Sequence, residues 1–152
     1  MTHLQVGDSA PDFAITNQSG ELIKLSDFSD KKLIIFFYPK DNTPGCTAES
    51  CNLKDNYSDL LEKGFEVVGV SADDAVSHQK FIAKFSLPYN LLADTNKEMI
   101  KSYGVWGEKK FMGKVYDGIH RTTFVINNGV VEKIFLKVKT KEHSNQIIES
   151  YK

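Results

Sequence analysis

The length and composition of the chain are those of an ordinary globular domain. With 152 residues, of which 41% are hydrophobic and 26% charged, it is long enough to bury a core and too mixed for a disordered or membrane protein. Its 19 basic and 20 acidic residues give a formal net charge of -1, and the lysines are spread along the chain. This pattern favours neither nucleic acid nor an anionic membrane as a partner.

The N-terminal stretch MTHLQVGDSAPDF lacks the charged start and apolar segment of a secretory signal, and no apolar run has the length of a membrane span. We therefore expect a cytoplasmic protein. Because thiols are kept reduced in that compartment, the two cysteines, Cys46 and Cys51, are expected to be reactive or metal-binding rather than a permanent disulfide.

The chain begins with signals for a hairpin and a buried strand. Turn residues within FAITNQSGELIKL indicate a hairpin over residues 13–25, and the apolar run KLIIFFYP over residues 32–39 predicts a central strand covered on both faces. Thr43 then offers an N-cap hydroxyl and Pro44 the preferred first helical position. Together they predict a helix that closes at Gly64.

The remaining segments alternate between strand and helix. The expected elements are a strand over 65–73, a helix over 74–86, a strand over 89–94, a helix over 95–104, a polar loop over 107–118, two strands over 122–138 joined at Asn128-Gly129, and a helix over 142–151. This order predicts an α/β fold, with a mixed central sheet flanked by helices on both faces and an N-terminal hairpin. We expect one domain over residues 1–152.

The two cysteines occupy different positions in the helix predicted after Thr43. With Pro44 as the first helical residue, Cys46 falls in the first turn, where unpaired backbone N–H groups and the helix dipole stabilise an anion. A thiolate is such an anion, so we expect Cys46 to be partly ionised and nucleophilic. Cys51 lies more than a turn deeper and gains much less, which makes Cys46 the attacking thiol and Cys51 its partner.

Helix geometry keeps these two thiols apart. Residues five apart in an ideal helix have Cα atoms about 8.5 Å from each other, whereas a disulfide tolerates at most about 7 Å. A disulfide between Cys46 and Cys51 therefore requires the first turns to unwind, unlike the shorter C-x-x-C spacing. A small oxidant such as a peroxide is the natural first reactant for Cys46, and Cys51 would then condense with the resulting sulfenic acid.

The segment YPKDNTPGCTAESC resembles the active-site segment of the peroxiredoxins, whose pattern Pro-x-x-x-Thr-x-x-Cys is met by Pro39, Thr43 and Cys46. The second cysteine, Cys51, resembles that of the bacterioferritin comigratory protein subgroup, also called peroxiredoxin Q. The stretches APDF, YGVWGEKKFMGK and GIHRTTFVI agree as well, so the similarity covers essentially the whole chain. The resemblance implies a thioredoxin-like fold and a peroxidase that reduces hydrogen peroxide and organic hydroperoxides.

The resemblance also implies roles for individual residues. Cys46 would be the peroxidatic cysteine and Cys51 the resolving one, closing a disulfide within the chain. Thr43 would hydrogen-bond the peroxide, Pro39 would shield the thiolate, and Arg121 would stabilise both thiolate and peroxide.

The resemblance further implies a supporting residue for Arg121 and a thiol reductant as partner. Glu49, one turn after Cys46, would hold Arg121 by a charge-assisted pair. No metal or organic cofactor is needed, and a thiol donor such as thioredoxin would return the electrons. Because the disulfide forms within one chain, we expect a monomer.

Plainer explanations exist for the same residues. Thr43 could be only an N-cap, Pro39 a strand end, Arg121 a surface arginine and Glu49 a partner of the helix dipole. We expect the following aromatic residues to pack within an ordered loop: Trp106, Phe111 and Tyr116. The four histidines, His3, His78, His120 and His143, show no ligand spacing, which argues against a metal site.

Two other functions remain open from the residues alone. A general thiol-disulfide oxidoreductase would reduce protein disulfides readily and peroxide slowly. A redox sensor or chaperone-like module would expose apolar surface when the helix unwinds.

Overall fold

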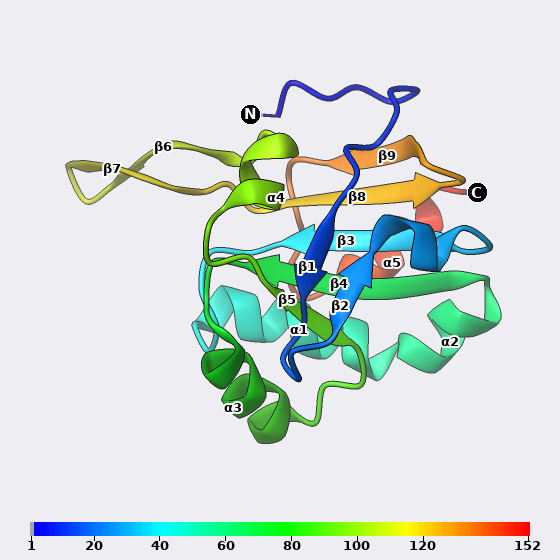
Figure 1. The fold of residues 1–152 in the computed structure, drawn as a ribbon, viewed down its shortest axis with the longest axis horizontal. Helices are drawn as coiled ribbons and strands as arrows, with labels where there is room; N and C mark the ends of the chain where they lie inside the picture. The colour runs from blue at the N-terminus through cyan, green and yellow to red at the C-terminus, as the bar shows by residue number, and fades with distance from the viewer. Residues whose placement is uncertain (1) are drawn as a thin grey trace.

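A five-stranded mixed sheet forms the centre of the fold (Figure 1), and the structure, a computed structural model, describes residues 2–152. The strand order is β5-β4-β3-β8-β9. The strands are β3 (Lys32–Phe37), β4 (Phe65–Ser71), β5 (Asn90–Ala93), β8 (Thr122–Asn127) and β9 (Val130–Phe135). Strand β3 pairs in parallel with β4 and antiparallel with β8, so the expected mixed sheet is confirmed.

Strand β3 separates two hydrophobic cores because its side chains alternate between the faces of the sheet. One core receives Leu33, Ile35 and Phe37, and the other receives Ile34, Phe36 and Tyr38. All six side chains are almost completely buried. The uninterrupted apolar run in the sequence thus reflects burial on both faces.

Helices cover both faces of this sheet. One face is covered by α4 (Glu98–Ser102) together with the N-terminal hairpin of β1 (Ala14–Thr16) and β2 (Leu22–Lys24) and the short 3₁₀ helix η1 (Leu25–Phe28). The opposite face is covered by α1 (Pro44–Asp55), α2 (Tyr57–Glu62), α3 (Ala75–Phe85) and α5 (His143–Glu149). Among residues 2–152, no helix combines the length and apolar character needed to cross a bilayer.

The single helix expected from Thr43 to Gly64 is wrong, because the chain breaks at Asn56. This residue has φ -112° and ψ 11°, outside the helical region, and separates α1 from α2. Its side-chain Nδ2 donates to the carbonyl of Asn52 at 2.8 Å. Asparagine side chains compete in this way with backbone hydrogen bonds, which accounts for the interruption.

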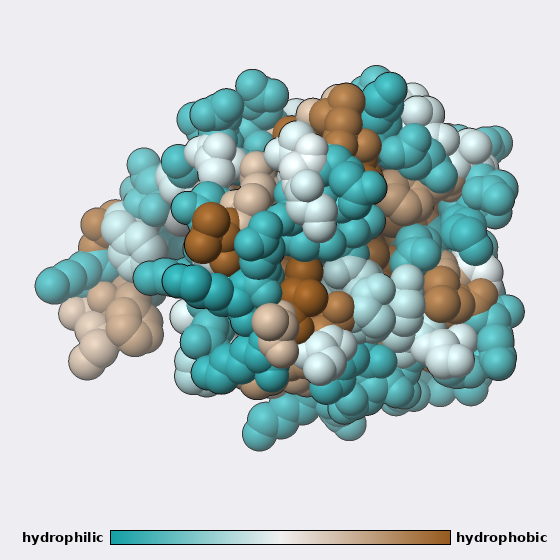
Figure 2. Space-filling model, turned by 60° about the horizontal axis from the view of Figure 1, so that its bottom comes forward, coloured by the Kyte–Doolittle hydropathy of each residue, from teal (hydrophilic) through white to brown (hydrophobic). Residues whose placement is uncertain are grey.

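The polar loop expected over residues 107–118 is also wrong, because it forms a hairpin of β6 (Trp106–Phe111) and β7 (Lys114–Ile119). Met112 and Gly113 both have positive φ, as a two-residue turn of this kind requires. The hairpin projects from the body of the protein (Figure 1), and hydrophobic side chains gather on the projection (Figure 2).

The packing predicted for the aromatic residues of this hairpin is correct only at its base. Trp106 packs against the core, as expected. Phe111 and Tyr116 are 65% and 48% exposed, so their predicted packing is wrong. Asn128 and Gly129 both have positive φ and form the predicted turn between β8 and β9.

Candidate active site

The first turn of α1 carries the predicted nucleophile. Thr43 occupies the N-cap position, Pro44 is the first helical residue, and Cys46 follows in the same turn, as the sequence predicted. The first helical hydrogen bond runs from Thr47 N–H to the carbonyl of Thr43 at 2.8 Å. The backbone N–H groups of Gly45 and Cys46 come before that bond, so they lack helical acceptors and their positive ends lie beside the thiol.

The hydroxyl of Thr43 does not cap the helix as expected. It donates instead to the carbonyl of Lys40 at 2.9 Å, which closes the turn before the helix. The hydroxyl oxygen keeps its lone pairs, so it can still accept a hydrogen bond from a ligand. Pro39 is half-buried in the segment that leaves β3 for this turn.

Arg121 joins Cys46 to Glu49 through the two arms of its guanidinium. Nη2 donates to Sγ of Cys46 at 3.3 Å, and Nη1 donates to Oε1 of Glu49 at 2.7 Å. Cys46 is 1% exposed, while the Arg121 side chain is 23% exposed and forms the accessible side of the pair. The structure therefore brings together three of the predicted residues in one contact.

Strand register explains why a residue so distant in sequence reaches the thiol. Thr122, the first residue of β8, pairs with Phe37, the last residue of β3. Arg121 therefore stands beside the loop that leads from β3 into α1. Gly45 leaves room for it, because a Cβ at that position would lie 3.1 Å from Nη2 of Arg121.

Glu49 is a fully buried carboxyl whose two oxygens have different surroundings. Burial raises its pKa to about 7, and the charge and hydrogen bond of Arg121 offset only part of that effect. Its second oxygen, Oε2, has no hydrogen-bond partner within residues 2–152 and lies 3.6 Å from Nε2 of His143. Burial lowers the pKa of Arg121, but the charges and hydrogen bonds of Glu49 and Cys46 have the larger combined effect, so the pKa of Arg121 is raised overall.

His143 lies behind Glu49 and was not predicted as part of the site. Its Nδ1 lies 2.9 Å from Oε1 of Gln146, which also accepts from the N–H of Lys139. Nδ1 must therefore carry the proton, leaving Nε2 to accept from the hydroxyl of Thr123 at 2.8 Å. Burial lowers the pKa of His143 to about 4, so the ring is neutral at neutral pH. Only the folded chain, not the spacing of histidines, reveals this neighbour.

Lys109 adds a second cationic side chain near the thiol. Its Nζ donates to the carbonyl of Ile119 at 2.9 Å. Burial lowers the pKa of Lys109, the positive charge of Arg121 lowers it further, and Cys46 offsets part of the change. No local sequence signal marks this residue, which belongs to the hairpin that was predicted to be a loop.

Cys51 lies in the same unbroken helix as Cys46, and both thiols are free. Cys51 is partly exposed, whereas Cys46 is buried. Because the helix is continuous between them, ideal geometry places their Cα atoms about 8.5 Å apart, beyond the reach of a disulfide. The arrangement is a reduced dithiol that must change shape in order to close.

Comparison with known proteins agrees with this geometry. The AhpC/TSA family matches residues 6–134. Peroxiredoxin Bcp of Escherichia coli (strain K12) is 42% identical over 149 residues, covering 97% of this chain and 96% of that protein.

Two solved structures have a similar fold. A Xanthomonas campestris bacterioferritin comigratory protein, described for its alkyl peroxide reduction activity, has a TM-score of 0.87 and 29% identity, with 99% of this chain and 96% of the other covered. A cysteine-to-serine mutant of the PrxQ protein of Xylella fastidiosa has a TM-score of 0.90 and 28% identity, with coverage of 99% and 97%. The expected thioredoxin-like fold is confirmed.

A buried thiol at a helix start on this fold, held by an arginine, defines a thiol-dependent peroxidase. The chain belongs to the AhpC/TSA family, and within it to the peroxiredoxins of the bacterioferritin comigratory protein or peroxiredoxin Q type. Its activity on peroxides implies a thiol reductant as partner.

Proposed function

We propose that Cys46 is the peroxidatic cysteine of this enzyme and that Cys51 resolves it. The contact of Arg121 with both Cys46 and Glu49 carries this assignment, because it places a fixed positive charge on one thiol and not on the other. Thr43 and Arg121 would hydrogen-bond the peroxide, and Pro39 would shield the thiolate. Glu49 would hold Arg121 in position.

The reaction balances with the residues present and one external reductant. The Cys46 thiolate takes the terminal oxygen of hydrogen peroxide or an organic hydroperoxide, the O–O bond breaks, and the leaving oxygen takes up a proton to give water or an alcohol. The thiol of Cys51 condenses with the sulfenic acid, and water leaves as the disulfide forms. A dithiol protein such as thioredoxin then reduces the disulfide to two thiols.

The burial of Cys46 supports this function over that of a general thiol-disulfide oxidoreductase. At 1% exposure the sulfur is out of reach of the disulfide of a folded protein. The one sheet with a core on each face supports a single domain over residues 1–152. We further propose that the enzyme acts as a cytoplasmic monomer and needs no metal or organic cofactor.

One equivalent of hydrogen peroxide added to the reduced protein tests these assignments. We expect loss of both thiols within milliseconds, an unchanged monomer mass less two hydrogens, and a change in Trp106 fluorescence. Thiols that survive for minutes would contradict the assignment of Cys46. If a hydrophobic dye bound more strongly after oxidation without turnover, the sensor or chaperone-like function would be favoured.

A further inference from the structure

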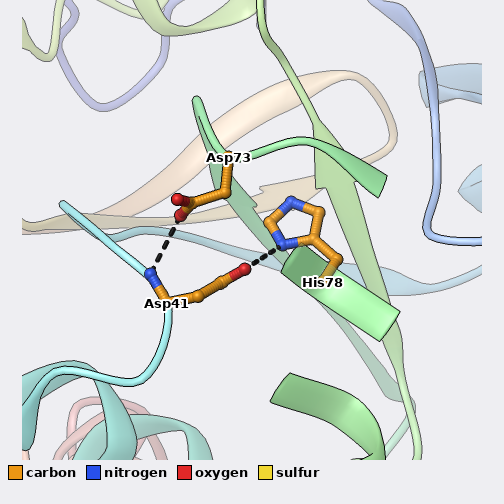
Figure 3. Close-up of side chains that lie close together, drawn as sticks. All are labelled: Asp41, Asp73 and His78. Carbon is orange, nitrogen blue, oxygen red and sulfur yellow. Dashed lines mark hydrogen bonds and ion pairs between the residues drawn. The ribbon is translucent and has the colours of Figure 1, made fainter. Parts of the chain in front are cut away.

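The loop between β3 and α1 is tied to the protein through one buried aspartate. Asp41 is 7% exposed and accepts three side-chain hydrogen bonds, from Tyr38 Oη at 2.6 Å, Ser77 Oγ at 2.8 Å and His78 Nδ1 at 2.7 Å. Its backbone N–H donates to Asp73 at 2.9 Å. Figure 3 shows Asp41 on its loop between Asp73, which follows β4, and His78 on α3.

Hydrogen-bond geometry fixes the protons of this cluster. Nε2 of His78 lies 2.9 Å from the carbonyl of Leu92, so that nitrogen must donate. A second proton must then lie between Nδ1 and Asp41. Burial and the negative charge of Asp41 raise the pKa of Tyr38, so its hydroxyl stays protonated and donates to the carboxylate. Tyr38, Ser77 and His78 therefore all make hydrogen bonds to the one buried carboxyl group of Asp41.

The same contacts argue against a metal ion in this cluster. Ligand atoms of Asp41, Asp73 and His78 lie within 4.8 Å of one another, a spacing that could suit a cation. Both oxygens of Asp41, both ring nitrogens of His78 and Oδ2 of Asp73 already take part in hydrogen bonds. The cluster is a closed network that holds a loop.

A second set of contacts fixes α1 further along. The hydroxyl of Tyr89 donates to the carbonyl of Ser50 at 2.6 Å. Asn52 donates to the carbonyl of Lys141 and accepts from the N–H of Ser144, which ties α1 to α5. The chain is therefore anchored at Asp41 and again from Ser50 onward. In the stretch 42–49 between these anchors, Cys46 and Glu49 are held by the side chain of Arg121.

The stretch between the anchors is suited to unwinding. It begins at Asn42, whose φ of 59° is a left-handed conformation that asparagine tolerates well. Cys46 is its only member in the apolar core, since Leu53 lies beyond the second anchor. Few apolar contacts and a helix end make local opening easy.

We propose that Asp41, held by His78, is a positioning residue that fixes where unwinding of α1 begins and keeps Thr43 and Cys46 in place before peroxide arrives. This inference rests on the proposed function, because it assumes that Cys46 reacts first and closes on Cys51. The network holds the reduced, helical form. Weakening it makes peroxide attack slower and disulfide closure faster, because the unwound form becomes more populated.

Stopped-flow single turnovers on three variants test the proposal. Asp41→Asn keeps the side-chain shape and removes its charge, while Tyr38→Phe and Ser77→Ala each remove one hydroxyl donor to Asp41. For Asp41→Asn we expect peroxide attack to slow roughly tenfold, as loss of a charged hydrogen bond would predict. Disulfide closure should accelerate, and less sulfinic acid should form at high peroxide. The milder variants should show smaller changes in the same two directions.

Val131→Ala is the matched control, since it loosens the core at the opposite end of the sheet, beside Ile126. If the network variants altered both steps in the same direction, or matched this control, Asp41 would be a structural residue alone. The behaviour of the wild-type protein distinguishes a failure of the proposed cysteine roles from a failure of the proposed role of Asp41. If it fails to lose both thiols, the assigned cysteine roles fail, whereas normal wild-type behaviour with unaltered variants overturns only the role of Asp41.

Discussion

Arg121 Nη2 donates to the sulfur of Cys46 at 3.3 Å although 75 residues separate them in the chain. The other arm of the guanidinium is fixed on a buried carboxylate, that of Glu49. A charge held on both sides does not need to reorganise when the peroxide arrives, and such preorganised donors are effective in stabilising developing charge.

Replacing Arg121 with Met should therefore slow the first oxidation by roughly 100-fold, the usual cost of losing a preorganised charged donor. Arg121→Lys is the matched variant, because it keeps the charge and loses the two-armed contact; it should fall between wild type and Met. Single-turnover loss of the Cys46 thiol is the measurement. If the Met variant lost the Cys46 thiol as fast as wild type, Arg121 would be a surface arginine with no part in the reaction.

Gly45 offers a test of the same contact that leaves the arginine unchanged. A Cβ at this position would stand 3.1 Å from Nη2 of Arg121, whose movement is restricted by Glu49 and Cys46. We expect Gly45→Ala to displace the guanidinium and slow peroxide attack roughly tenfold, as for loss of a charged hydrogen bond.

The helix itself should tolerate this change, because alanine is a better helix former than glycine. Thermal unfolding is therefore the companion measurement. Equal or higher thermal stability together with slower attack would locate the effect at Arg121. Loss of stability in proportion to activity would instead indicate a general packing defect.

Local patterns in the sequence were sufficient to predict the central strands and the helix start. Apolar runs of strand length predicted β3 and β4 as buried strands, and Thr43 with Pro44 predicted where α1 begins, so Cys46 was placed correctly in the first turn. These features depend on neighbours along the chain. The break at Asn56 depends on one side chain competing for a backbone carbonyl, which propensity alone does not resolve.

Features that depend on distant segments were not predictable from local patterns. Predicting a role for Arg121 required the family pattern, and the structure explains its position through the pairing of β8 with β3. His143 beneath Glu49 and His78 beside Asp41 come from other helices, so no sequence spacing marks them. The β6–β7 hairpin was missed because Met112, rather than Asn or Gly, adopts the left-handed turn conformation.

Cys51→Ser should separate the two chemical steps. Cys46 keeps its arginine contact in this variant, so the first oxidation should proceed at the wild-type rate and stop at the sulfenic acid. Intact mass should show one added oxygen after one equivalent of peroxide, and two or three after excess. Cys46→Ser is the control and should gain none. If Cys51→Ser consumed no peroxide in a single turnover, the two cysteine roles would have to be exchanged.

The buried pair of Glu49 and His143 predicts opposing effects of pH on stability. Burial raises the pKa of Glu49 from 4.5 to about 7, so the folded protein holds that proton more tightly, and this group makes stability fall as pH rises through that range. Burial lowers the pKa of His143 from 6.5 to about 4, so the folded protein resists protonation. This group makes stability fall as pH drops from 6.5 toward 4. The two effects nearly cancel in the wild type.

Removing either group should expose the effect of the other. As the pH rises from 4.5 to 7, Glu49→Gln should gain stability relative to wild type, by up to about 3 kcal/mol. A shift of one pKa unit corresponds to about 1.4 kcal/mol. His143→Gln should show the opposite trend, gaining toward acid pH. Urea unfolding of the reduced proteins at several pH values measures both, and other titrating groups cancel in the difference from wild type. Differences that stay constant with pH would mean that neither buried group titrates as the structure indicates.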